Sequence, residues 1–286
     1  MSSIDAGGRT VGYEQGGDPA GRPVMLFHGF GDSRLTHPDH AGAAALGVRL
    51  VSMDRPGIGL TDPLPARSLL DRVGDVAAVA DHLGLDRFAV LGWSGAGPHA
   101  LACAYALGER ITAVGVACGF APFDRPAVRA VLSPTLRQGA ALLGRLPFLA
   151  GPLMRQTANR YRRNPATAFE KQFGAALSPA DRTVLADRAV HDNLLAGAVE
   201  AFRQGPGGLA AEMRLLFTRP WGFQPEDVHR PVHLWYGDDD RMVPAGVGRY
   251  LASVLPEASL MVYPGEGHLL YHTHWDEILK TLTDGA

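Results

Sequence analysis

Short runs of apolar residues recur along the chain, and turn residues bound most of them. Such runs are typical of strands that are buried on both faces of a parallel sheet. They cover residues 23–27, 48–53, 88–93, 111–118, 231–236 and 260–263, and a more mixed run covers residues 9–15. Between two of them, Leu69, Val73 and Val76 lie at helical spacing, and Gly84 marks the end of that helix. The alternation predicts an α/β fold with a mostly parallel central sheet and helices on both faces.

A long region with a different pattern interrupts this alternation. Over residues 121–225 the apolar residues recur at helical spacing, prolines divide the region into short segments, and no strand-like alternation is visible. Ser178-Pro179-Ala180-Asp181 combines a capping hydroxyl, a proline at the first helical position and a carboxylate in the first turn. We therefore expect residues 1–120 and 226–286 to form one core, and residues 121–225 to form an inserted, all-helical cap.

Composition limits the partners of the chain. The 286 residues contain 27 Lys and Arg against 29 Asp and Glu, so the net charge of -2 gives no long-range attraction to nucleic acid or to an anionic membrane. We expect a small-molecule substrate that is roughly neutral and partly apolar. The N-terminus lacks the pattern of a signal peptide, and no apolar run is long enough to span a membrane, which predicts a cytoplasmic protein. Cys103 and Cys118 lie in apolar segments and are interpreted as packed thiols.

The sharpest feature is a serine that follows an apolar run. In Gly92-Trp93-Ser94-Gly95-Ala96, residues with little or no side chain lie on both sides of Ser94. When a strand turns into a helix within a few residues, the residue at the apex is forced into strained dihedral angles. The N-terminus of the helix then offers unpaired N–H groups to developing negative charge. This arrangement predicts that Ser94 is an activated nucleophile.

A serine nucleophile needs a base and an acid, which we expect at the carboxyl ends of the strands. Of the eleven histidines, His28 and His268 directly follow an apolar run, and the glycine-rich loop of His268 can reach across the sheet. We assign His268 as the base and interpret His28 as a residue that holds its loop by hydrogen bonding. The candidate acids are Asp240, its neighbours Asp238 and Asp239, and Asp124.

These motifs resemble those of the α/β-hydrolase family. Gly92 to Ala96 is similar to its G-x-S-x-G nucleophile elbow, with Ala96 in place of the last glycine. Residues 54–62, DRPGIGLTD, resemble its D-R-P-G-x-G-x-S-D loop, in which Asp54 and Arg55 have a structural role, and Thr61 stands here for serine. The resemblance covers nearly the whole chain.

The resemblance also implies roles for particular residues. Asp240 occupies the position of the acid in G-x-x-D-x-x-V-P, and the chain order Ser94, Asp240, His268 is that of the family. The backbone N–H groups of Phe30 and Gly95 would form the oxyanion hole. No metal and no organic cofactor is called for.

The sequence thus predicts a serine hydrolase that cleaves a small carboxylic ester or lactone through an acyl-enzyme. Carbon-carbon bond hydrolysis and acyl transfer use the same three residues and stay open, as does a ligand-binding receptor with this fold. Two further features have two interpretations each. Trp221 and Phe223 either line a pocket or belong to the core. Four arginines either form a solvated helix face or bind an anionic substrate tail: Arg155, Arg160, Arg162 and Arg163.

Overall fold

The computed structural model describes residues 2–65, 68–174 and 176–284. The described strands form one eight-stranded sheet with the order β1-β2-β4-β3-β5-β6-β7-β8. Their bounds are β1 (Ser2–Asp5), β2 (Thr10–Gly17), β3 (Arg22–Phe27), β4 (Val48–Met53), β5 (Phe88–Trp93), β6 (Ile111–Ala117), β7 (Val232–Gly237) and β8 (Ala258–Tyr263).

Strands β4 to β8 and β3 are parallel, whereas β1 and β2 form an antiparallel edge. This confirms the predicted α/β fold with a mostly parallel sheet. The prediction missed β1, because its four residues pair only with β2 and show no apolar run of their own. Strand β5, which leads to Ser94, lies between β3 and β6 inside the sheet, so both of its neighbours hold its carboxyl end in place.

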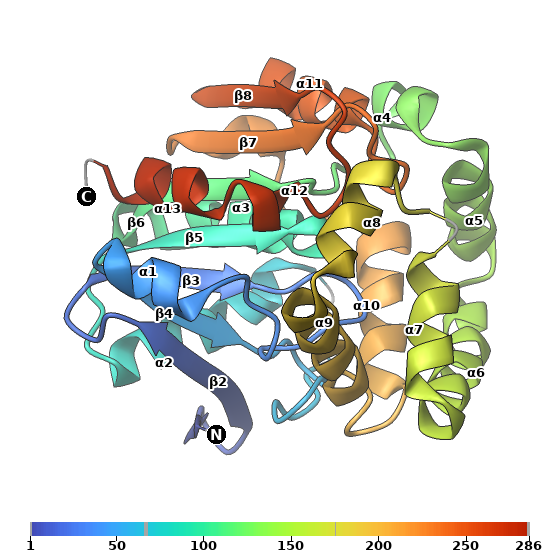
Figure 1. Cartoon of the computed structure of the whole chain (residues 1–286), viewed down its shortest axis with the longest axis horizontal. Helices are drawn as coiled ribbons and strands as arrows, with labels where there is room; N and C mark the ends of the chain where they lie inside the picture. Colours follow the sequence, from blue (N-terminus) through green and yellow to red (C-terminus); the bar gives the residue numbers. More distant parts are fainter. Residues whose placement is uncertain (1, 66–67, 175, 285–286) are drawn as a thin grey trace.

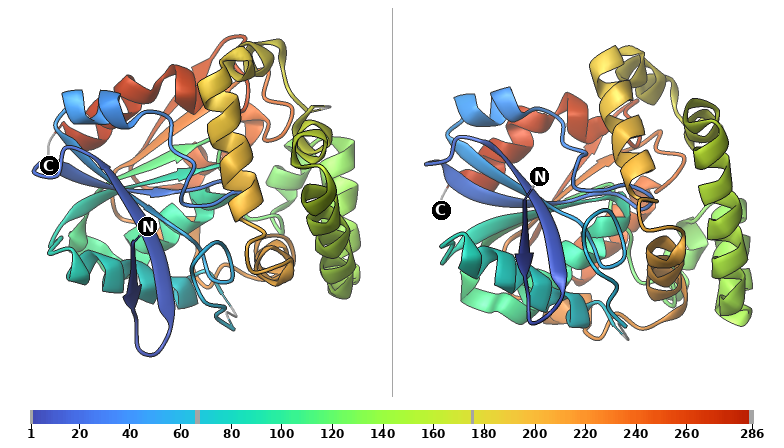
Figure 2. Two further views of the ribbon diagram at one scale, coloured as in Figure 1. Left: turned by 60° about the horizontal axis from the view of Figure 1, so that its bottom comes forward. Right: turned by 90° about the horizontal axis from the view of Figure 1, so that it is seen from below.

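Helices cover both faces of the sheet (Figures 1 and 2). One face carries α2 (Val73–His82), α3 (Gly97–Leu107) and α11 (Ala245–Val254). The other face carries α1 (His40–Ala45), α12 (Leu270–Thr273) and α13 (Trp275–Thr283). Single turns of 3-10 helix are η1 (Leu70–Arg72), η2 (Ser94–Ala96), η3 (Gly108–Arg110), η4 (Pro147–Leu149) and η5 (Pro225–Asp227). Within the described ranges, no helix combines the length and apolar character needed to cross a bilayer.

Between β6 and β7 the described chain is helical, and we call α4 to α10 the helical block. Its members are α4 (Pro126–Val131), α5 (Pro134–Arg145), α6 (Ala150–Arg163), α7 (Pro165–Phe173), α8 (Pro179–Ala186), α9 (Arg188–Glu200) and α10 (Gly207–Thr218). Side-chain caps begin several of them, and Ser178 with Asp181 forms the capping box that starts α8. In Figure 1 the block lies beyond the arrowheads of the parallel strands, at the edge where ligands bind in such sheets.

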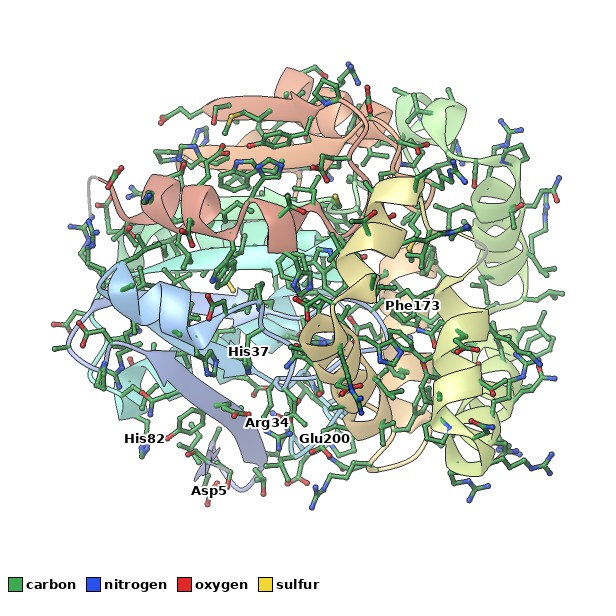
Figure 3. The ribbon with its side chains drawn as sticks, in the orientation of Figure 1. Asp5, Arg34, His37, His82, Phe173 and Glu200 are labelled. Carbon is green, nitrogen blue, oxygen red and sulfur yellow. The ribbon has the colours of Figure 1, made fainter. Side chains whose placement is uncertain are left out.

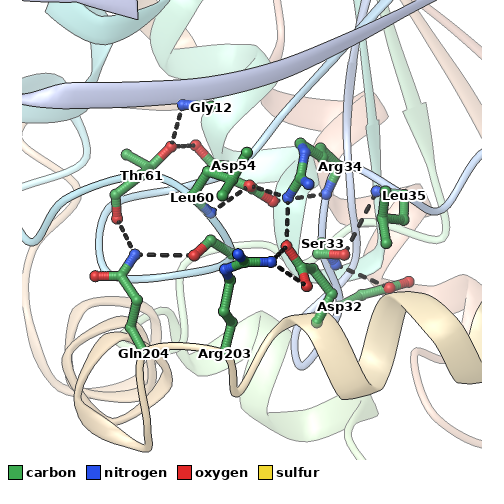
Figure 4. A network of polar contacts seen from close by, with 12 residues as sticks. Gly12, Asp32, Ser33, Arg34, Leu35, Asp54, Leu60, Thr61, Arg203 and Gln204 are labelled. Atoms are coloured by element: carbon green, nitrogen blue, oxygen red, sulfur yellow. Dashed lines mark hydrogen bonds and ion pairs between the residues drawn. The ribbon is translucent and has the colours of Figure 1, made fainter. Parts of the chain in front are cut away.

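Buried polar contacts fix the helical block to the core loops (Figures 3 and 4). Arg34, which follows β3, lies with one nitrogen 2.7 Å from Asp54 Oδ2 and 2.8 Å from Glu200 Oε1 on α9. The side chains of Arg34 and Asp54 are 0% exposed. Gln204, just after α9, donates to the carbonyl oxygens of Gly59 and Thr61 at 3.0 and 2.9 Å. A buried charge is stable only with its partners, so these contacts hold the block at this edge.

The turn after β5 leaves no space for larger residues. Ser94 has a φ of 55°, a left-handed conformation that is rare for a residue with a side chain. A β carbon on Gly92 would collide with the carbonyl oxygen of Ala96, and one on Gly97 would lie 2.9 Å from Gly119 Cα. Ala96 is itself fully buried, so the turn accepts the methyl group that replaces the usual glycine.

We predict that Gly92→Ala destabilises the protein, because the new methyl group meets backbone that cannot move aside. The free energy of unfolding should fall by about 1–3 kcal/mol, measured by urea denaturation. Gly139→Ala is the matched control. Gly139 lies inside α5 with no atom near the position of its β carbon, so alanine there should raise stability by about 0.5–1 kcal/mol. Equal stability of Gly92→Ala and the wild type would contradict the tight turn.

Candidate active site

Three of the residues singled out in the sequence meet in one chain of hydrogen bonds. Ser94 Oγ lies 2.9 Å from His268 Nε2, and His268 Nδ1 lies 2.8 Å from Asp240 Oδ2. Because a carboxylate only accepts, Nδ1 carries the proton, and Nε2 is left to accept from the serine hydroxyl. All three side chains are buried. Serine, histidine and aspartate therefore have the mutual contacts that activation of a serine hydroxyl requires.

Asp240 contacts His268, and the other candidate acids do not. Its Oδ1 accepts from the backbone N–H groups of Met242 and Val243, both at 2.8 Å, which leaves Oδ2 for His268. Asp238 is exposed and accepts from the N–H of Gly265 at 2.6 Å. Asp239 pairs with Arg241, and Asp124 is exposed after β6. The backbone hydrogen bonds of Asp240 hold its carboxylate in the orientation that His268 needs.

Trp93, inside the elbow, also holds the loop of residues 264–269, which carries His268 and is called the histidine loop below. Trp93 Nε1 donates to the carbonyl oxygen of His268 at 3.0 Å. Its ring stacks on Tyr271 with a centroid separation of 4.7 Å and lies 5.5 Å from the ring of His268. In the elbow motif, position 93 is a variable residue to which the pattern assigns no role. Alternation along β5 was the available signal, since it places Trp93 on the face that α12 covers.

An aspartate from the helical block binds the same loop. Asp181 Oδ2 accepts from the N–H of Ser178 at 2.9 Å, and Asp181 Oδ1 accepts from the N–H of Leu269 at 2.7 Å. A β carbon on Gly267 would collide with both Ser178 and Asp181, so α8 lies directly against the loop. The sequence predicts Asp181 as a carboxylate in the first turn of this helix. Its second partner, Leu269, is distant in sequence and could not be predicted.

The environment of His268 favours its protonated form. Burial alone would lower its pKa, but the carboxylate of Asp240, through charge and hydrogen bond, and the charge of Asp181 together raise the pKa above the usual 6.5. An imidazole with this environment accepts a proton readily, and the resulting imidazolium is stabilised. The site is therefore suited to a proton transfer from Ser94.

Two glycine-rich loops meet beside Ser94. A β carbon on Gly95 would lie 3.2 Å from the backbone nitrogen of Phe30, so the two segments predicted to supply the oxyanion hole are in contact. Arg55 donates to the carbonyl oxygens of His28 and Gly29, the latter at 2.9 Å. His28 Nδ1 lies 3.0 Å from the carbonyl oxygen of Gly29. Arg55 and His28 thus hold the loop in shape, as predicted.

Ser94 and His268 open onto a pocket of about 270 Å³ between the core loops and the helical block. Residues from α6 and α7 form the opposite wall, and Phe173 of α7 is labelled in Figure 3. Arg160 lines this pocket, whereas Arg155, Arg162 and Arg163 do not. Trp221 and Phe223 do not line it either. Both are buried in the core between the sheet and its helices, and they also border a separate groove along α4, α5 and α10.

Cys118, Asp240 and His268 have potential ligand atoms within 4.8 Å of one another, but their chemistry does not fit a metal. Burial and the neighbouring Asp240 carboxylate raise the pKa of the Cys118 thiol well above its usual value. The sulfur is therefore a neutral thiol, and it lies 3.8 Å from the carbonyl oxygen of Gly267. Asp240 and His268 already bond to each other. Cys118 is thus a packed thiol beneath the acid, in line with the sequence interpretation.

Comparison with known proteins identifies the family. The family model described as the alpha/beta hydrolase fold matches residues 22–274. The chain therefore belongs to the α/β-hydrolase family, which confirms the family and the fold inferred from the elbow and its accompanying loops.

The similar proteins have several activities. A 2-hydroxy-6-oxononadienedioate/2-hydroxy-6-oxononatrienedioate hydrolase from Pseudomonas putida is 27% identical over 278 residues, which cover 91% of this chain and 86% of that protein. A thermophilic esterase from Thermogutta terrifontis superposes with a TM-score of 0.71 at 21% identity, covering 99% of this chain and 97% of its own. The enol-lactonase from Burkholderia xenovorans LB400 gives 0.71 at 17% identity, covering 99% and 98%. The two solved structures establish a shared fold.

We predict that Asp181→Asn lowers the pKa of His268, because the variant removes a negative charge that stabilises the imidazolium. The asparagine amide group would also face the backbone N–H of either Ser178 or Leu269, where the aspartate oxygen now accepts a hydrogen bond. Because two donors cannot pair, the free energy of unfolding should fall by about 1–3 kcal/mol. NMR titration of the imidazole measures the pKa. Asp187→Asn is the control, because Asp187 also caps a helix of the block, as the N-cap residue of α9 that accepts from the N–H of Ala189, and makes no hydrogen bond to the loop of His268. An unchanged titration of His268 in Asp181→Asn would contradict the coupling.

Proposed function

We propose that the protein is a serine hydrolase that cleaves a small carboxylic ester or lactone through an acyl-enzyme. The hydrogen-bonded chain from Ser94 through His268 to Asp240, open to a pocket of about 270 Å³, is the observation that carries the proposal. This volume lies just below the range of about 300–1,000 Å³ that is typical of sites for drug-sized ligands, which suits a small acyl group. Esterase and enol-lactonase structures with the same fold support this choice of bond.

In the first half-reaction, Ser94 Oγ attacks the carbonyl carbon of the ester. His268 Nε2 takes the hydroxyl proton, and Asp240 stabilises the imidazolium through the hydrogen bond to Nδ1. Negative charge develops on the carbonyl oxygen, for which we assign the N–H groups of Phe30 and Gly95 as donors. When the tetrahedral intermediate collapses, the bond to the leaving oxygen breaks and His268 returns the proton to it. The acyl group is then bound to Ser94.

In the second half-reaction, water replaces the serine as the nucleophile. His268 Nε2 takes a proton from the water as its oxygen attacks the acyl carbon, and the same two N–H groups hold the oxyanion. Collapse releases the carboxylic acid and returns the proton to Ser94 Oγ. In a lactone, the leaving alcohol stays attached to the product.

The helical block acts in this proposal as a cap. Residues of α6 and α7 form the wall opposite Ser94, which favours exclusion of bulk water and selection of the acyl group. The proposed limits of the cap are those from the sequence, residues 121–225.

Hydrolysis of a carbon-carbon bond is the second candidate reaction, because the relative from Pseudomonas putida is named for a 2-hydroxy-6-oxo dienedioate substrate.

We predict that a fluorophosphonate labels the protein at Ser94, because this reagent reacts with an activated serine hydroxyl. Mass spectrometry of the labelled peptide identifies the site. Ser94→Ala should be unlabelled and should hydrolyse p-nitrophenyl butyrate at least about 10³-fold more slowly. Ser52→Ala is a control, because this buried serine of β4 lies outside the pocket. A wild-type protein that neither reacts with the reagent nor hydrolyses activated esters would instead be a ligand-binding receptor.

We predict that kcat/KM for the same ester falls as the pH is lowered, because the base must be neutral to accept a proton. The pKa of His268 is raised, so the midpoint of this acid limb should lie above 6.5. Initial rates from about pH 5 to about pH 9 give the profile, and circular dichroism at each pH checks that the fold persists. A rate that stays constant across this range would exclude His268 as the base.

A further inference from the structure

The wall of the pocket that faces Ser94 carries two cations. Arg160 on α6 and Lys171 on α7 both line the pocket. Neither side chain makes a hydrogen bond or ion pair with any residue that the structure describes. Among the described residues that line the pocket there is no aspartate or glutamate. The pocket is therefore positively charged although the chain as a whole has a net charge of -2.

An amide group adds a third donor on the same wall. The hydroxyl of the buried Tyr161 donates to Gln172 Oε1 at 2.9 Å, which fixes the orientation of the amide. Gln172 Nε2 points the other way and lies 3.0 Å from where a β carbon on Gly31 would be. It donates to no described residue in the structure. Its N–H groups therefore lie beside the loop of Phe30, in the pocket.

These two cations differ from the other arginines of α6. All four arginines of α6 and Lys171 of α7 are exposed, but Arg155, Arg162 and Arg163 lie outside the pocket, and Arg162 donates to Asn159 one turn earlier. A charged residue on an exposed helix is normally a solvated one. Arg160 and Lys171 come from two helices and converge on one cavity that also contains a nucleophile, and no acid balances them. Unpaired donors in such a cavity favour a ligand that brings its own negative charge.

We propose that Arg160, Lys171 and Gln172 form a subsite for an anionic group of the substrate, a carboxylate or a phosphate, which is separate from the carbonyl group that Ser94 attacks. Arginine can bind either anion through two parallel hydrogen bonds, and lysine adds a point charge. The substrate is then an ester or lactone with a second, negatively charged end. This deepens the function proposed above and rests on it, and it replaces the neutral substrate expected from the net charge.

Binding to an inactive protein tests the subsite without relying on hydrolysis. In Ser94→Ala, calorimetry compares monomethyl adipate, which has one free carboxylate, with dimethyl adipate, which has none. The monoester should bind at least about tenfold more tightly, as expected for hydrogen bonds to a charged group. Butyl phosphate in a further arm shows which anion the subsite prefers. Equal binding of the monoester and the diester, with no binding of butyl phosphate, would overturn the proposal.

Variants assign the effect to the two cations. Arg160→Gln combined with Lys171→Gln in the same background should remove the preference for the anion. Arg155→Gln is the matched control on the same helix and should keep it. If the double variant still binds the monoester more tightly than the diester, the proposal is also overturned. In the active protein, the ratio of kcat/KM for mono-p-nitrophenyl adipate to that for its methyl ester should follow the binding data. If neither ester is hydrolysed but the anion binds as described, the subsite stands and ester hydrolysis fails.

Discussion

The left-handed backbone of Ser94 is the constraint on which the rest of the site depends. A serine at a φ of 55° costs about 1–3 kcal/mol, and a free chain would relax to another conformation. Here the contacts of Gly92 with Ala96 and of Gly97 with Gly119 close off the alternatives, while β3 and β6 hold both sides of β5. The strain places the hydroxyl at the end of the sheet where His268 can reach it, and it does so before any substrate is present.

A second set of constraints comes from buried polar groups that join distant segments. Asp181 binds the histidine loop, Glu200 binds Arg34 after β3, and Glu212 of α10 lies 2.7 Å from Arg55, which holds the loop of Phe30. Each of these three carboxylates belongs to the helical block, and each acts on a loop that borders Ser94. The helical block thus holds the loops around Ser94 in position, in addition to lining the pocket.

Much of this architecture could be predicted from the sequence, because local patterns determine it. The buried strands are apolar runs, the elbow is a run of small residues, and the capping box of α8 is a local motif. The strand β1 and the helix α1 were missed, since the former depends on pairing with β2 and the latter has only six residues. The family resemblance predicted Asp240 as the acid, whereas the residues alone left its neighbours Asp238 and Asp239 open, and the hydrogen bonds of the folded loop distinguish the three.

The contacts of Trp93 and Asp181 with the histidine loop could not have been predicted, because they join residues that are far apart along the chain. The positive charge of the pocket could not be predicted from the sequence for a similar reason. A sum over the whole sequence averages Arg160 and Lys171 with acidic residues elsewhere, and only the fold shows which charges share a cavity.

The helical block enters and leaves the sheet at two neighbouring strands, β6 and β7. An insertion whose ends lie so close together could in principle be exchanged for one of another length, leaving the sheet intact. The three carboxylates set a condition on that freedom. A transplanted block without counterparts of Glu200 and Glu212 would leave the buried Arg55 without its carboxylate partner and Arg34 with Asp54 alone, and one without Asp181 would leave the N–H of Leu269 unpaired. New specificities should therefore arise more easily by changing residues on the inner surfaces of α6 and α7 than by replacing the whole insertion.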